Sequence, residues 1–185
     1  NFTRRGFLQV AAASSAGAAL AATSLDTAWA REPKATLAVV PLNGGLSLVT
    51  GAGGNVVVMG GPEGALLVDG GNAANSAALL KLALKTTGAK QVHTLFNTHW
   101  HPDQTGSNER VAKTGGRIIA QENTKLWLGR KITTEWLPAG YGPLPKPALP
   151  NKSFYTTDAI DFGGDTLKFG HLGQAHTDGD LYVHF

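Results

Sequence analysis

The chain has 185 residues, of which 42% are hydrophobic and 16% are charged, a composition that is ordinary for one globular domain. The formal net charge is only +3 and the basic residues form no block, so charge gives no reason to expect nucleic acid or an anionic lipid surface as a partner. The chain has no cysteine. Disulfides and thiolate ligands within it are therefore excluded, and a metal site has to be built from imidazole, carboxylate or amide groups.

The first thirty residues have the pattern of an export signal. Residues 3–9 read Thr-Arg-Arg-Gly-Phe-Leu-Gln, which resembles the motif of twin-arginine signal peptides. A soft apolar stretch follows at residues 10–22, and Ala-Trp-Ala at residues 28–30 is a small-x-small cleavage site. This stretch is shorter and less apolar than the roughly 20 residues of a membrane anchor, so no stable anchor is expected. The resemblance implies the twin-arginine translocase as a partner, a bacterial periplasmic location and a mature domain of residues 31–185.

Four short strands are predicted before residue 70, because β-branched and apolar segments alternate there with glycine-rich turns. The predicted strands are residues 36–40, 46–49, 56–59 and 65–68. The glycines are not followed by the Gly-Lys-Ser/Thr ending of a phosphate loop, so hairpin turns are expected.

After residue 72 the pattern changes to alternating helices and strands. With Asn72 as N-cap, apolar residues at helical spacing predict a helix that stops near Gly88. The other predicted elements are strands at 91–97 and 117–120, helices at 108–113 and 121–128, and a hairpin of 159–162 with 166–169. Five of the nine prolines lie in residues 138–150, which predicts a loop there. The alternation favours α/β layers over an all-β barrel.

Residues 97–106, Asn-Thr-His-Trp-His-Pro-Asp-Gln-Thr-Gly, lie between a predicted strand and a predicted helix. In an extended chain, residues two apart point the same way, so His99, His101 and Asp103 are expected to converge at the strand's end. A further imidazole, His176, follows 75 positions after His101 in the loop Gly-Gln-Ala-His-Thr-Asp-Gly-Asp. A catalytic zinc takes three protein ligands and leaves a place for water, and three histidines meet that count.

Together these motifs resemble those of the metallo-β-lactamase superfamily. His-x-His-x-Asp and the distant Gly-x-x-His-Thr-x-Gly-Asp match its second and third motifs, and Asp69 after an apolar strand matches its first. The resemblance implies an α+β fold, the four-layer αβ/βα sandwich, of which this chain is the front part. It implies His99, His101 and His176 as ligands of one zinc ion, and Asp103 as a ligand of a second metal. Asp69 would lie beneath the site and orient the ligand loop by hydrogen bonds.

Gln104 departs from the family pattern, which usually has a histidine after the aspartate. A carboxamide is a poor zinc ligand, so one zinc is expected, while a second metal, or iron in place of zinc, stays open. The family's fourth and fifth motifs would lie beyond Phe185. The apolar run of residues 181–185 predicts a strand whose sheet neighbours come from further sequence, so we expect the chain to be C-terminally truncated.

The expected function is hydrolysis of a small-molecule ester, thioester or lactam by a metal-bound hydroxide. Asp103 is expected to orient the water and take up its proton. Phosphodiester hydrolysis and iron-dependent sulfur oxidation also occur in the superfamily, and these motifs do not separate them. Two alternatives remain. A non-catalytic periplasmic metal-binding or relay protein is favoured by Gln104, and a β-lactamase proper is favoured by the export signal.

The remaining candidate residues receive structural interpretations. Three histidines are expected to pack or to face the solvent: His93, His171 and His184. Asp178 and Asp180 suit turn and cap chemistry, with distant ligation as the alternative. Trp100 is expected to point away from the ligands and to pack in the core. Trp136, Tyr141 and the proline-rich segment either roof the substrate pocket or form a surface connection.

Overall fold

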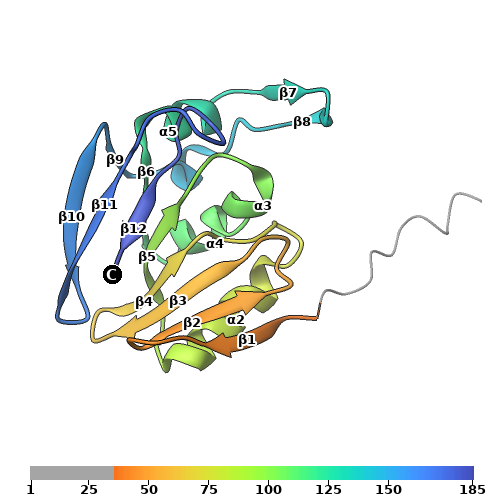
Figure 1. The fold of residues 1–185 in the computed structure, drawn as a ribbon. Coiled ribbons are helices and arrows are strands. Elements are labelled where there is room, and N and C mark those ends of the chain that lie inside the picture. Colours follow the sequence, from red (N-terminus) through yellow and green to blue (C-terminus); the bar gives the residue numbers. More distant parts are fainter. Residues whose placement is uncertain (1–35) are drawn as a thin grey trace, which may run out of the picture. The chain divides into compact units, whose positions relative to one another are not determined.

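A computed structural model describes residues 36–185, which form one folded unit (Figure 1). The predicted export signal, residues 1–30, lies outside the described residues. Among the residues that are described, no helix is both long and apolar enough to cross a membrane.

A seven-stranded sheet forms the centre of the fold, with the strand order β1-β2-β3-β4-β5-β6-β9. Its strands are β1 (Ala38–Pro41), β2 (Leu46–Thr50), β3 (Val56–Gly61), β4 (Gly64–Val68), β5 (Val92–Asn97), β6 (Arg117–Gln121) and β9 (Lys152–Phe154). The first four strands are antiparallel hairpins, whereas β4, β5, β6 and β9 run parallel. The parallel half places the carboxyl ends of β4 and β5 side by side, at the edge where ligand sites form in such sheets.

Helices α2 (Ser76–Thr87) and α4 (Asn108–Lys113) cover one face of this sheet. The other two helices are the single turn α3 (Pro102–Thr105) and α5 (Glu122–Leu128). The apolar faces of α2 and α4 pack in one cluster with strand residues that include Leu67, Leu95 and Ile118, all of which are buried. The hydrophobic effect of this burial holds the helical layer on the sheet.

The prediction that Asn72 caps α2 is wrong. The helix begins at Ser76 with Asn75 at the N-cap position. The side chain of Asn72 instead accepts a hydrogen bond from the backbone N–H of Asn75, at 2.9 Å. Asn72 therefore closes a turn before the helix, which is the local backbone bonding that makes asparagine common in turns.

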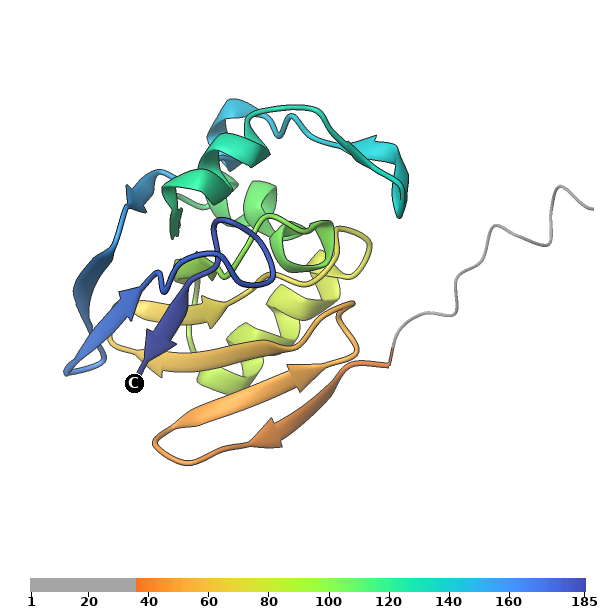
Figure 2. The same cartoon turned by 45° about the horizontal axis from the view of Figure 1, so that its top comes forward.

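A three-stranded sheet lies on the other face of the central sheet. It contains β10 (Thr157–Phe162), β11 (Asp165–Gly170) and β12 (Tyr182–His184), in that order. The space between the sheets is filled by a second cluster, in which Phe96 meets Phe169 edge to face with ring centroids 5.0 Å apart. Figure 2 shows the resulting layers, with helices, the large sheet and the small sheet in succession. These are three of the four layers of the predicted α+β sandwich.

The segment of residues 138–150 was predicted as a loop, and this is only partly right. β7 (Ile132–Thr134) and β8 (Leu137–Tyr141) form a two-stranded hairpin, and η1 (Lys146–Ala148) is a short 3-10 helix. Pro138 is tolerated in β8 because each strand of such a ribbon has an unpaired edge. The hairpin projects from the body beyond α3 in both views (Figures 1 and 2).

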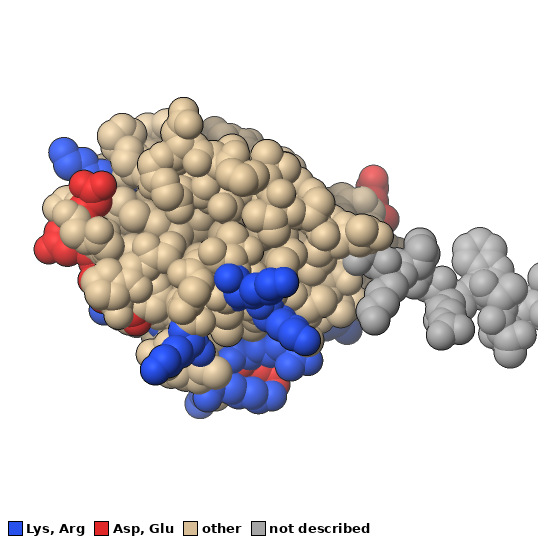
Figure 3. Space-filling model, turned by 90° about the horizontal axis from the view of Figure 1, so that it is seen from below, with Lys and Arg blue, Asp and Glu red and all other residues tan. Residues whose placement is uncertain are grey.

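Lys and Arg side chains gather on part of the face that Figure 3 shows, which looks from below Figure 1. Bases lie in the last turns of the two helices on the sheet, Lys85 in α2 and Arg110 and Lys113 in α4. Positive charge is favourable at a helix C-terminus because of the helix dipole. These bases therefore stabilise the C-terminal ends of the two helices, and Arg110 also donates to the hydroxyl of Ser76 at 2.9 Å.

Candidate metal centre

The loop that follows β5 is fixed at both of its ends. Asn97 and Asn108 are fully buried and exchange two side-chain hydrogen bonds, of 2.8 and 3.0 Å. Ser107 donates its hydroxyl proton to the carbonyl of Gly70. Residues 98–107 are therefore held as a rigid connection between β5 and α4, with little freedom for the histidines they carry.

Gly106 has no room for a side chain, because a Cβ there would overlap backbone atoms of Asn72 and Ala73. We expect Gly106→Ala to lower the free energy of unfolding by about 3 kcal/mol, since rigid backbone cannot move aside. Urea unfolding measures this loss. Gly129→Ala is the matched control, because its nearest neighbour would lie 3.5 Å away. Equal stability of the two variants would contradict the close packing of the loop on residues 71–73.

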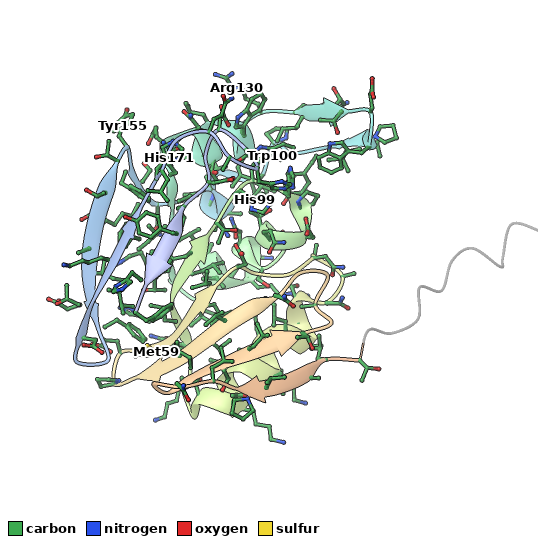
Figure 4. The ribbon with its side chains drawn as sticks, viewed as in Figure 1. Met59, His99, Trp100, Arg130, Tyr155 and His171 are labelled. Atoms are coloured by element: carbon green, nitrogen blue, oxygen red, sulfur yellow. The ribbon has the colours of Figure 1, made fainter. Side chains whose placement is uncertain are left out.

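Three imidazoles meet at the rim of the sheet. One ring nitrogen from each of His99, His101 and His176 lies within 4.8 Å of the others. Nε2 of His176 is 3.2 Å from Nδ1 of His101. The ring centroids lie 4.5 to 4.9 Å apart and the rings are nearly perpendicular. Figure 4 shows His99 just below the β7–β8 hairpin. The structure thus brings together the three histidines that the sequence singled out.

The electrostatic environment keeps two of these imidazoles neutral. Burial, with the neighbouring rings of His101 and His176, lowers the pKa of His99 to about 4. Burial and the His176 ring also lower the pKa of His101. A neutral imidazole has a free lone pair, and this is the form that binds a metal ion.

A hydrogen-bonded chain from Asp69 sets the orientation of His99. The carboxylate of Asp69 accepts from the backbone N–H of Thr98 at 2.8 Å and from its hydroxyl at 2.8 and 3.0 Å. The hydroxyl oxygen lies 3.0 Å from Nδ1 of His99. Because the hydroxyl donates to the carboxylate, it accepts from Nδ1–H. Nε2 of His99 then carries the lone pair that faces the other two imidazoles.

Asp69 is itself under strain. It is the only non-glycine residue in the described part of the chain with a positive φ, 69°. Burial raises its pKa to about 7, although hydrogen bonds from Thr98 act in the opposite direction. Strained backbone and a buried acid typically cluster at functional sites.

Asp103 does not share the extended geometry predicted for residues 99–103. Pro102 opens the single turn of α3, so Asp103 lies in a helix rather than at the second step of a strand. It is not part of the three-histidine group, and its Oδ2 accepts from Nε2 of Gln104 at 2.8 Å. The carboxamide of Gln104 also packs against the backbone of Gly54. The role of Asp103 as a ligand of a second metal stays a prediction.

The loop of His176 is organised by Asp180. Its carboxylate accepts from the backbone N–H groups of His176 and Thr177, at 2.6 and 3.0 Å, and from the Thr177 hydroxyl at 2.6 Å. Burial raises the pKa of Asp180, but these hydrogen bonds outweigh it and the net pKa is lowered. Asp180 therefore shapes the turn, as its position in Asp-Gly-Asp suggested. His171, half-buried, lies with Nδ1 2.7 Å from the carbonyl of Asp180 and reinforces the same turn.

Helix α5 holds the other side of this loop. Asn123 and Thr124 donate to the carbonyls of Asp178 and Gly179, at 2.8 and 2.9 Å. The indole N–H of Trp127 donates to the carboxylate of Asp178 at 2.8 Å. Sequence reasoning missed these α5 residues, because no local pattern relates a polar helix to a loop 55 positions away.

Aromatic side chains line the site beside His101. Trp100 is buried, as predicted, in a cluster with Leu128 and Ile132. It does not point away from the ligands as expected, because its ring centroid lies 4.3 Å from that of His101. Trp136, at the tip of the β7–β8 hairpin, lies with its ring 4.8 Å from that of His101. The hydroxyl of Tyr141 lies 2.7 Å from that of Thr105 in α3. The hairpin is thus a wall of the site and not a remote surface connection. The two remaining histidines lie apart from the group, His93 beside Phe162 and His184 exposed on β12.

Comparison with solved structures finds the same fold in several proteins. A metallo-beta-lactamase from Pontibacter korlensis is 23% identical, with a TM-score of 0.63, over 81% of this chain and 67% of its own. A subclass B3 metallo-beta-lactamase of Bradyrhizobium japonicum is 22% identical, with a TM-score of 0.66, over 81% and 57%. A metallo-beta-lactamase of Cronobacter sakazakii is 19% identical, with a TM-score of 0.62, over 78% and 58%. The chain thus spans about three fifths to two thirds of the length of these proteins.

A comparison with curated protein sequences gives no match. The family model of the metallo-beta-lactamase superfamily matches residues 49–185, from β2 to the last residue of the chain. This range includes Asp69 and the three histidines. By this match, the chain belongs to the metallo-beta-lactamase superfamily.

Proposed function

We propose that the protein is a zinc-dependent hydrolase that acts on the ester, thioester or lactam carbonyl of a small molecule. The observation that carries this proposal is the gathering of His99, His101 and His176 around one point. Family membership adds the context of a metal-dependent hydrolase fold.

The three imidazoles fit a zinc ion. Zinc–nitrogen bonds of about 2.0–2.1 Å in tetrahedral geometry place two ligand nitrogens about 3.3 Å apart. The 3.2 Å between Nε2 of His176 and Nδ1 of His101 agrees with this value. A set of three imidazole nitrogen donors would leave a fourth position for water, as catalytic zinc sites do.

A bound zinc ion would lower the pKa of a water molecule and polarise the substrate carbonyl. The protein's own residues then have separate roles. The Asp69–Thr98 pair holds His99 with Nε2 directed at the site. Gln104 donates to Oδ2 of Asp103, which leaves Oδ1 to accept the proton of the attacking water. Trp136 covers His101 and limits the access of bulk water.

A lactam is the carbonyl that the comparisons favour. The Cronobacter sakazakii metallo-beta-lactamase is described by its motif HARLDQ. Residues 99–104 of this chain read HWHPDQ, so both motifs begin with histidine and end with Asp-Gln. The glutamine that departs from the usual family pattern is therefore compatible with a protein that bears the name β-lactamase.

A non-catalytic metal-binding or relay role is the second candidate, because Gln104 is a neutral side chain bound to Asp103. A substrate screen separates the two. Zinc-loaded protein is incubated with neutral esters, thioesters and cephalosporins, and turnover is compared with that of protein treated with a chelator. Turnover that is lost with the metal supports the hydrolase. Stoichiometric zinc without turnover of any substrate supports the binding role.

We further propose export by the twin-arginine translocase, on the basis of Arg4 and Arg5 in the first thirty residues. Residues 1–35 fused to a folded reporter are expected to direct it to the periplasm of a bacterial host. Replacing both arginines by lysine should reduce periplasmic reporter at least tenfold while leaving its total amount unchanged. Cell fractionation measures both quantities, and undiminished export of the double-lysine fusion would contradict the proposal.

A further inference from the structure

We propose that Trp136 forms the subsite for a planar aromatic group of the substrate, attached by a short linker to the carbonyl that reacts. This inference deepens the proposed hydrolase function and rests on it. We call the three tryptophans Trp100, Trp127 and Trp136 the indole ledge.

The indole ledge runs from Trp136, beside His101, to Trp127, beside the loop that carries His176. Trp136 lies over Trp100 in a stacked arrangement, with ring centroids 6.0 Å apart and 23° between the planes. Trp127 lies 6.1 Å from Trp100 and donates to Asp178. The ledge is thus continuous with both loops that supply the imidazoles.

The rings of the indole ledge differ in how far they are exposed to solvent, and this gives them different roles. Trp100 is only 8% exposed and serves as the base of the ledge, whereas Trp136 is 57% exposed. Because one face of Trp136 is directed at Trp100, the exposed part is its opposite face and edge. A large apolar ring that stays half-exposed beside a candidate metal centre offers a ready surface for a ligand.

Contacts at both ends of the β7–β8 hairpin hold Trp136 in its position. The hairpin that carries it is tied down by Ile132, which is buried against the Trp100 cluster. The hydroxyl of Tyr141 at the other end of the hairpin lies 2.7 Å from that of Thr105. A ring that is held in place pays little entropy when a ligand stacks on it, so the contact contributes more to binding.

The geometry selects an aromatic ligand group. An indole face offers a flat apolar surface, and offset stacking suits another planar ring better than a branched alkyl group. The 4.8 Å between the rings of His101 and Trp136 means that a ring stacked on Trp136 lies close to a carbonyl held at the imidazoles. The linker between ring and carbonyl is therefore short, and the probe used below has a single methylene.

Two hydroxamates that differ only in the ring test the subsite by binding alone. Acetohydroxamic and phenylacetohydroxamic acid are titrated into zinc-loaded full-length protein by isothermal calorimetry. We expect phenylacetohydroxamic acid to bind roughly 5- to 10-fold more tightly. In Trp136→Ala this ratio should fall to about 1 to 2, and in Trp136→Phe most of it should remain. The ratio cancels any change in zinc affinity that both ligands share.

Tyr155→Ala is the matched control. Tyr155 is 73% exposed, and Figure 4 places it on the opposite side of the molecule from the β7–β8 hairpin. The control should keep the wild-type ratio. Trp136→Leu keeps an apolar contact with Trp100 but removes the flat ring, so it tests the same point if the alanine variant is unstable.

Two results would overturn the inference and are distinct from each other. If both hydroxamates bind equally to the wild type, or if the ratio survives in both Trp136→Ala and Trp136→Leu, the aromatic group is bound elsewhere or not at all. If neither hydroxamate binds, the proposed zinc centre itself fails, and the subsite that depends on it fails with it.

Discussion

Replacing His99 with alanine is expected to weaken zinc binding by roughly 10³-fold and to abolish measurable turnover. The variant leaves two imidazoles of a group in which three nitrogens lie within 4.8 Å. Two ligands still chelate, but they no longer fix the ion in a tetrahedral set. Zinc per chain after dialysis, measured by elemental analysis, should fall from about one to near zero. Turnover of a chromogenic ester or cephalosporin should fall in parallel.

His184→Ala is the control for this experiment. His184 is an exposed residue of β12, and it is not part of the histidine group. Its loss should leave both zinc content and turnover unchanged. Unfolding of each variant in the presence of a chelator separates loss of a ligand from loss of the fold. Unchanged zinc content in a folded His99→Ala variant would show that the ligand assignment is wrong.

The sequence was sufficient to place two of the three imidazoles. The apolar run of residues 91–97 predicts a strand, and the structure has β5 at Val92–Asn97. His99 and His101 follow the strand directly, so their proximity is local. The ligand count alone could offer His176 only as a third candidate, and the family resemblance then assigned it, because its distance from the pair depends on β11 and β12 returning to the same edge.

The remainder of the site depends on tertiary packing that no local pattern records. Trp136 lies beside His101 because Ile132 is buried against Trp100, which sets the direction of the hairpin. Pro102 opened a helical turn and removed Asp103 from the extended geometry that spacing alone implied. Residues two apart point the same way only while the chain is extended. A proline directly after the second histidine indicates that a helix begins there and that the extended segment ends.

The substitution Asp69→Asn is expected to weaken zinc binding by roughly 10- to 100-fold, although Asp69 touches no part of the proposed ion. The Thr98 hydroxyl is 2.8 Å from Oδ2 of Asp69. An amide nitrogen in place of Oδ2 would donate to this hydroxyl, which frees the hydroxyl proton to be directed at Nδ1 of His99. The lone pair of Nε2 would then be lost to a proton in the competing tautomer.

A competition titration with a chromogenic chelator measures the zinc affinity, and nitrogen NMR of the His99 ring reports its tautomer. Asp165→Asn, at an exposed carboxylate of β11, is the control and should change neither. Wild-type affinity in Asp69→Asn would contradict the proposed role of the Asp69–Thr98 pair. A reduced affinity with an unchanged His99 tautomer would leave only a general structural role for Asp69.

The same variant is expected to remove a pH-dependent contribution to the stability of the metal-free protein. Burial raises the pKa of Asp69 from its ordinary 3.8 to about 7. The unfolded chain therefore loses this proton first, and the free energy of unfolding falls as the pH rises from about 4 to about 7. The difference between the two pKa values corresponds to about 4 kcal/mol at most. Asparagine does not titrate, so the stability of Asp69→Asn relative to the wild type should increase over this range in urea unfolding with chelator. A difference that does not change with pH would mean that Asp69 carries its charge in the fold without penalty. The predicted increase would show that the buried carboxylate of Asp69 destabilises the fold as the pH rises, and that its role lies in the metal site above it.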